Sequence, residues 1–93
     1  MKHLIIAKFK KDFDYEDRIT DIKSIFEELL NIDGIHNVNV YPKCIFRENR
    51  YDLMIEIEME KEVLPTYDSS APHKKWIQNY AEHVELKTIF DYE

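Results

Sequence analysis

Residues 51–60 read Tyr-Asp-Leu-Met-Ile-Glu-Ile-Glu-Met-Glu and show the clearest alternation in the chain. Every second position is apolar, and acidic residues occupy most of the positions between: the apolar set is Leu53, Ile55, Ile57 and Met59. Successive side chains of a strand point to opposite faces, so this pattern predicts a strand with one buried face.

Three further segments are predicted to be strands. Residues 3–9 are almost all apolar and have β-branched residues in the middle, which favours a central strand. Residues 35–41 alternate and end at Pro42, which a central ladder would not accommodate, so this strand is predicted at an edge. Residues 84–92 are rich in β-branched and aromatic side chains.

Two helices are predicted between these strands. In residues 15–31 the apolar side chains recur at helical spacing, and they are Ile19, Ile22, Phe26, Leu29 and Leu30. The second helix is predicted to start after Ser70, as a cap, with Pro72 in its first turn. Its buried side is predicted to carry Trp76, Ile77, Tyr80 and Ala81.

The resulting order, β-α-β-β-α-β, is the ferredoxin-like split βαβ pattern of the α+β class. It predicts a four-stranded antiparallel sheet with both helices on one face. At 93 residues the chain is short enough for a single domain, residues 1–93, and small enough that oligomerisation is expected.

Charge and cysteine content exclude several classes of partner. The chain has 13 Lys and Arg against 19 Asp and Glu, a net charge of −6, which argues against nucleic acid. Cys44 is the only cysteine and the four histidines match no ligand spacing, so neither a metal site nor another cofactor is expected. The first apolar run stops after four residues, which predicts no export signal, no membrane span and a cytoplasmic protein.

The sheet face opposite the helices is predicted to be mixed in character. Strand alternation places Leu4, Ile6, Met54 and Phe90 there, together with Lys8, Glu56 and Glu58. Two copies packed sheet against sheet would bury the apolar groups and bring Lys8 near the glutamates. We therefore expect a homodimer through this face.

Four segments in this order resemble the stress-responsive A/B barrel family, often called Dabb domains. They are residues 2–10 (Lys-His-Leu-Ile-Ile-Ala-Lys-Phe-Lys), 51–53 (Tyr-Asp-Leu), 67–76 (Tyr-Asp-Ser-Ser-Ala-Pro-His-Lys-Lys-Trp) and 89–92 (Ile-Phe-Asp-Tyr). The resemblance implies a ferredoxin-like protomer that dimerises through its sheets into an α/β barrel. It does not imply one reaction, since most members have no assigned activity and some plant members are polyketide cyclases.

The cyclase pattern implies three candidate catalytic residues. A tyrosine and a histidine six residues later flank the family's pocket, and Tyr67 and His73 keep that separation. His3 matches a histidine that begins the first strand in those enzymes. The pattern is not complete, because Leu53 and Ser70 stand where the cyclases have further histidines.

Each candidate has a chemical and a structural interpretation. His73 could act as a general base, because a neutral imidazole accepts protons near neutral pH, or it could pack at the helix start. Tyr67 could orient a substrate oxygen or serve as an aromatic support under the second helix. His3 could point into the pocket or lie partly exposed near the chain start.

Apolar residues from several elements would form the walls of such a ligand pocket. They are Ile5, Ala7, Phe26, Leu53, Ile55, Trp76 and Ile89, and they are equally the expected hydrophobic core.

Three functions stay open on the sequence. The first is a homodimeric barrel domain of undetermined activity that binds a small hydrophobic or aromatic molecule. The second is a cyclase-like or lyase-like enzyme with His73 as base and Tyr67 orienting the substrate. The third is an enzyme like the ferredoxin-like monooxygenases, which share the dimeric architecture.

Overall fold

The elements follow the predicted order, and a short helix lies between the third strand and the second long helix. The computed structural model describes residues 1–93. The strands are β1 (Lys2–Phe9), β2 (Ile35–Pro42), β3 (Leu53–Met59) and β4 (Val84–Tyr92); the helices are α1 (Ile19–Glu27), α2 (Leu64–Asp68) and α3 (Ala71–Tyr80).

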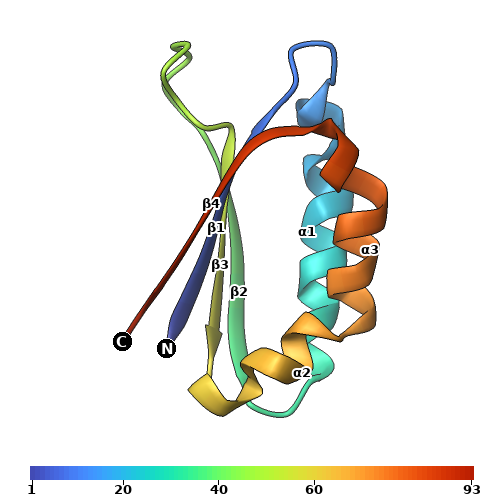
Figure 1. Ribbon diagram of the computed structural model, residues 1–93, viewed down its shortest axis with the longest axis vertical. Helices are drawn as coiled ribbons and strands as arrows, with labels where there is room; N and C mark the ends of the chain where they lie inside the picture. Colours follow the sequence, from blue (N-terminus) through green and yellow to red (C-terminus); the bar gives the residue numbers. More distant parts are fainter.

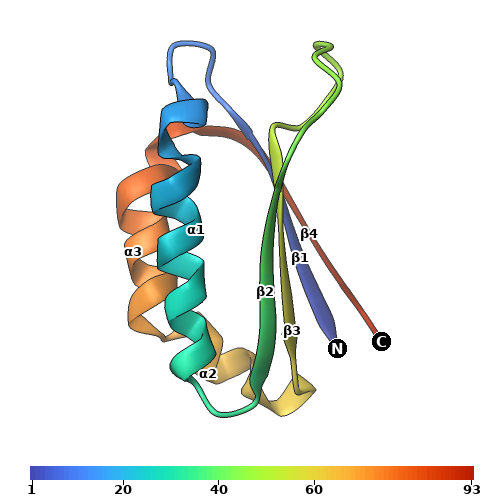
Figure 2. The same cartoon turned by 180° about the vertical axis from the view of Figure 1, so that it is seen from behind.

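The strands form one antiparallel sheet in the order β2-β3-β1-β4. As predicted, β1 lies inside the sheet, and β2, which ends at Pro42, lies at an edge. Helices α1 and α3 run side by side over one face of the sheet, with α2 at the end where the chain starts (Figure 1). Seen from behind, the other face of the sheet carries no helix (Figure 2).

Helix α1 is flanked by two 3₁₀ turns, Tyr15–Arg18 and Glu28–Asn31, which together span the predicted helical range. Its buried stripe extends into the second turn and consists of Ile22, Ile25, Phe26 and Leu29. The prediction was wrong for Leu30, which is 48% exposed, and it omitted Ile25. The cause is a small phase error, since neighbouring residues of a helix point about 100° apart.

Helix α3 begins as predicted, because the Ser70 side chain accepts a hydrogen bond from the His73 N–H and Pro72 lies in the first turn. Trp76 and Tyr80 are buried against the sheet and α1. The prediction was wrong for Ile77 and Ala81, which are both exposed. One turn separates Trp76 from Tyr80, and two large aromatic rings fill the contact face on their own.

The core lies between the sheet and the two long helices, and aromatic rings fill much of it. The Trp76 ring meets Phe26 edge-on at 5.3 Å and Phe9 at 6.5 Å, measured between ring centroids. Strands β1 and β3 contribute every second residue to this layer, and Ala7 is fully buried among them. The period-two pattern of residues 51–60 therefore marked the buried face correctly.

The helix-free face of the sheet, which we call the outer face, carries the predicted apolar residues. In the register Leu4 lies between Glu56 and Phe90, and Ile6 lies between Met54 and Thr88. Phe90 is 58% exposed in the protomer. The prediction that Lys8 pairs with glutamates of a second copy stays a prediction, and within the protomer Lys2 is the residue that reaches Glu56 (3.6 Å).

Asp52 departs from the alternation that placed it on the polar side of a strand. It is only 6% exposed, and its carboxylate accepts hydrogen bonds from the Phe9 N–H and the Lys43 ammonium, both at 2.7 Å. The hydrogen bond that Lys43 donates to Asp52 raises the pKa of Lys43 above its usual value. The strand begins only at Leu53, so Asp52 is free to bond to the end of β1.

The buried Tyr80 makes stability sensitive to alkaline pH. Burial, assisted by a hydrogen bond to Asp21, raises the pKa of Tyr80 to about 12. Between pH 10 and 12 the unfolded phenol ionises while the folded one keeps its proton, so the free energy of unfolding should fall across this range. We expect Tyr80→Phe to flatten this fall, measured by urea unfolding at pH 9 and pH 11. An unchanged slope in the variant would show that Tyr80 does not cause it.

Candidate functional site

Tyr67 lies between the two histidines that the sequence grouped with it. It belongs to α2 and is 1% exposed. Its ring meets His3 edge-on with 5.2 Å between centroids, and it meets His73 edge-on at 4.9 Å. The structure therefore brings the three candidate catalytic residues together, from β1, α2 and the first turn of α3.

The six-residue spacing of Tyr67 and His73 is held by Ser70, midway between them. The Ser70 hydroxyl donates a hydrogen bond to the Tyr67 carbonyl (2.7 Å) and accepts one from the His73 N–H (3.2 Å). One side chain thus closes α2 and caps α3, which fixes the angle between the two helices. Ser70 supports the candidate pair through the backbone and does not contribute a ring as a histidine would.

His3 is oriented by a residue to which the sequence analysis gave no role. It is 4% exposed, and its Nδ1 bonds to the carboxylate of Asp91 on the neighbouring strand β4, where the two residues are directly paired. A carboxylate only accepts hydrogen bonds, so Nδ1 carries a proton in this bond, and Nε2 is the ring nitrogen that Asp91 leaves free. The antiparallel register of the two strands was the signal that could have identified Asp91.

The environment of Tyr67 keeps its hydroxyl protonated. Burial raises the pKa of Tyr67 well above its usual range, and the charges of Asp68 and Asp91 raise it further. No protein atom hydrogen-bonds to this hydroxyl, although every fully buried polar side-chain atom has a partner. The hydroxyl is therefore a neutral donor without a protein partner on a ring that is only 1% exposed, and it can donate to a ligand oxygen.

The predicted wall residues of the ligand pocket differ in burial. Six of the seven are core residues with no more than 2% exposure: Ile5, Ala7, Phe26, Leu53, Ile55 and Trp76. Ile89 is 49% exposed, because β4 is an edge strand that runs away from α3 (Figure 1). A ligand in contact with the six core residues would have to move them apart.

Comparison with solved structures identifies the architecture. No family model and no curated protein matches the sequence. A dimeric protein of unknown function from Bacteroides fragilis, with a ferredoxin-like fold, is 21% identical and has a TM-score of 0.80, covering 99% of this chain and 93% of that one. The chain has the ferredoxin-like fold.

Two further solved structures are similar to the chain in fold. A Dabb family protein from Mesorhizobium loti is 16% identical, with a TM-score of 0.72, and the match covers 99% of this chain and 93% of that one. A hydroxynitrile lyase from Passiflora edulis is 12% identical, with a TM-score of 0.75 and coverage of 98% and 89%. At these identities the comparisons establish the ferredoxin-like fold of the chain, and the chemistry must come from its own residues.

Two other features are absent from the ferredoxin-like chain. No three side chains of His, Cys, Asp or Glu lie close enough together to hold a metal ion. None of its helices has the length and apolar character needed to cross a membrane.

Proposed function

We propose that residues 1–93 form a single domain of the stress-responsive A/B barrel type that dimerises through the outer face of its sheet. Two observations support the dimer. The outer face exposes Phe90 and Tyr92 on β4, beside Leu4 and Ile6 on β1. The Bacteroides fragilis neighbour with this fold is itself dimeric. The four segments that resemble the family support the assignment of the chain to it.

We further propose that each protomer binds a small hydrophobic or aromatic molecule beside Tyr67. The observation that carries this proposal is the unpartnered hydroxyl of Tyr67, with its ring held between His3 and His73. A buried ring with a free polar end suits a flat ligand that carries one oxygen. A local opening of the core would let the ligand contact the buried apolar wall residues.

The same three residues favour a cyclase-like or lyase-like activity as the second candidate. His73 would take a proton from an activated carbon, and the Tyr67 hydroxyl would donate to the oxygen that gains negative charge. His3, held by Asp91, would present Nε2 on the other side of Tyr67. The Passiflora edulis neighbour shows that a protein with this fold can be a lyase.

Binding can be tested with 2-naphthol, a neutral bicyclic phenol. A ligand present at about 100 times its dissociation constant adds about 2.7 kcal/mol to the free energy of unfolding. This gain raises the melting temperature by on the order of 10 °C. We expect this upshift for the wild-type protein. Tyr67→Phe and His73→Gln should each lose most of it, because each removes one polar contact and leaves the neighbouring packing in place.

His36→Gln is the matched control, since His36 is an exposed histidine on β2, and it should retain the full upshift. Equal upshifts in all four proteins would place the ligand elsewhere. If Tyr67→Phe lowers the melting temperature of the unliganded protein by several degrees, the hydroxyl has a structural role instead.

A further inference from the structure

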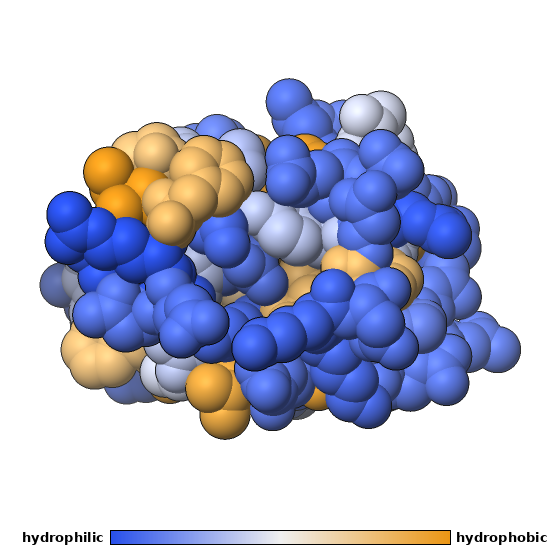
Figure 3. Space-filling view, turned by 90° about the horizontal axis from the view of Figure 1, so that it is seen from above, coloured by the Kyte–Doolittle hydropathy of each residue, from blue (hydrophilic) through white to orange (hydrophobic).

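A hollow lies at the end of the molecule away from Tyr67. It has a volume of about 430 Å³ and lies between the turn that follows β1 and the hairpin that joins β2 to β3. In Figure 1 both loops project beyond the helices at the end opposite the N-terminus. Figure 3, which views the molecule from this end, shows a recess rimmed by hydrophilic residues with paler and apolar atoms at its floor.

The charge of this hollow is opposite to that of the protein. Six of the 13 basic residues line it, and they are Lys8, Lys10, Lys11, Lys43, Arg47 and Arg50. Only three acidic residues do so, and they are Glu48, Asp52 and Glu85. The remainder of the chain holds the other seven basic and 16 acidic residues. An acidic protein therefore concentrates its positive charge at one recess.

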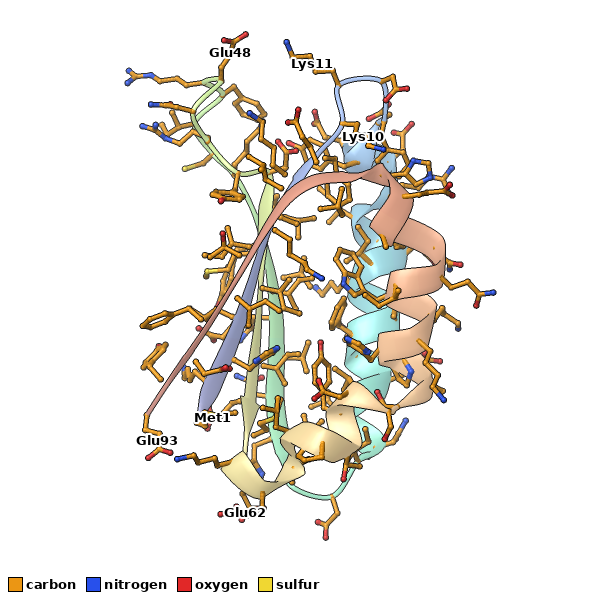
Figure 4. All side chains as sticks on the ribbon, viewed as in Figure 1. Met1, Lys10, Lys11, Glu48, Glu62 and Glu93 are labelled. Carbon is orange, nitrogen blue, oxygen red and sulfur yellow. The ribbon has the colours of Figure 1, made fainter.

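Most of these cations have no carboxylate partner. Lys43 is paired with Asp52, and Lys8 donates to the Glu48 backbone oxygen (2.7 Å). Five of the six cations therefore have no ion pair, and they are Lys8, Lys10, Lys11, Arg47 and Arg50. In Figure 4 Lys10 and Lys11 lie on the turn that faces the hairpin, and Glu48 lies at the hairpin tip.

Aromatic rings form the apolar part of the hollow. The Phe9 ring stacks on Tyr15 at 5.6 Å, with planes 7° apart, and contacts Phe13 at 5.4 Å. The Lys43 ammonium lies 5.5 Å from the centre of the Tyr15 ring. Phe13 and Tyr15 are both partly exposed. The hollow thus offers a flat apolar surface beside a group of unpaired cations.

We propose that this hollow binds a phosphate monoester with a flat apolar body. The phosphate would bind to Arg47, Arg50 and Lys11, because guanidinium and ammonium groups form strong charge-assisted bonds to phosphate oxygens. The apolar body would lie against Phe13 and Tyr15. Phe9 and His3 are six positions apart along β1, so the hollow lies about 20 Å from the Tyr67 site and is independent of it.

Phenyl phosphate is the smallest probe with both features. In isothermal titration calorimetry at low salt, we expect saturable binding of one molecule per protomer, weakened by added salt. The double variant Arg47→Gln/Arg50→Gln should weaken binding about tenfold or more, because it removes two charge-assisted bonds to the phosphate. Amide NMR shifts on titration should centre on residues 8–15 and 43–52.

The matched control is Lys23→Gln/Lys74→Gln, which removes two exposed, unpaired cations at other positions and changes the net charge equally. It should leave the affinity unchanged. The proposal is overturned if phenyl phosphate does not saturate by about 10 mM, or if both double variants weaken binding equally. NMR shifts centred on Tyr67 and His73 would also overturn it. Thermal unfolding of both variants verifies that they are folded.

Discussion

Replacing Ile6 with aspartate should convert the proposed dimer into a monomer. Ile6 lies in the middle of β1 on the outer face, between Met54 and Thr88 in the register. In the protomer it is partly exposed, so an aspartate there can stay hydrated. In a sheet-on-sheet dimer the carboxylate would be buried without a partner, which costs several kcal/mol per copy. A two-fold interface contains the substitution in both copies, so the dimer bears the cost of burying a carboxylate twice.

Sedimentation equilibrium would measure the mass of the variant, and circular dichroism would show whether the protomer keeps its fold. Ile77→Asp is a matched control, because it makes the same substitution at a 38% exposed site on the helical layer. It should leave the mass unchanged. A folded Ile6→Asp dimer with wild-type affinity would exclude the outer face as the interface.

Gly34→Ala should lower the free energy of unfolding by about 2–4 kcal/mol, from strain and overpacking together. Gly34 is the only glycine and has φ +94°, a backbone conformation that L-residues rarely adopt. A Cβ there would lie 2.4 Å from Val63 Cγ2 and 3.0 Å from Glu60 Oε2. The turn cannot move freely, because its carbonyl accepts a hydrogen bond from the Glu60 N–H (2.9 Å).

Repeating Gly34→Ala in a Val63→Ala variant separates backbone strain from overpacking. Val63→Ala removes the atom that the new Cβ would meet first, so Gly34→Ala should cost less in that variant, and the remaining cost measures the backbone strain. Urea unfolding of the four proteins provides the cycle. A cost within about 0.5 kcal/mol for Gly34→Ala in the wild-type background would contradict both causes.

The strands were predictable because their signals are local. Alternation at every second residue identified β3 and its buried face, and Pro42 marked β2 as an edge strand. Helix α3 was predictable because Ser70 and Pro72 act on the backbone within one turn. The finer helical details were less predictable, since Ile25 and Leu30 are both apolar and only the packing of α1 on the sheet decides which is buried.

The contacts that the sequence did not predict depend on the register of strands that are distant from one another in the chain. Asp52 is buried because Phe9 and Lys43 meet it, and neither is its neighbour in the chain. The bond between His3 and Asp91 likewise requires β1 and β4 to pair in one register. The sequence grouped Tyr67 with His73 by spacing alone, and their roles in ligand binding stay a prediction.

The position of β1 within the sheet also affects how the protein is made. Its two ladder partners are β3 and β4, and β4 is the last strand in the chain. During synthesis β1 therefore emerges before the other three strands and keeps one open edge until β4 has been translated. Over that interval its nearly continuous run of apolar residues is an aggregation hazard, because an unpaired edge is a template for another strand. The order of translation thus makes this sheet most vulnerable at a strand that is paired along both edges in the folded protein.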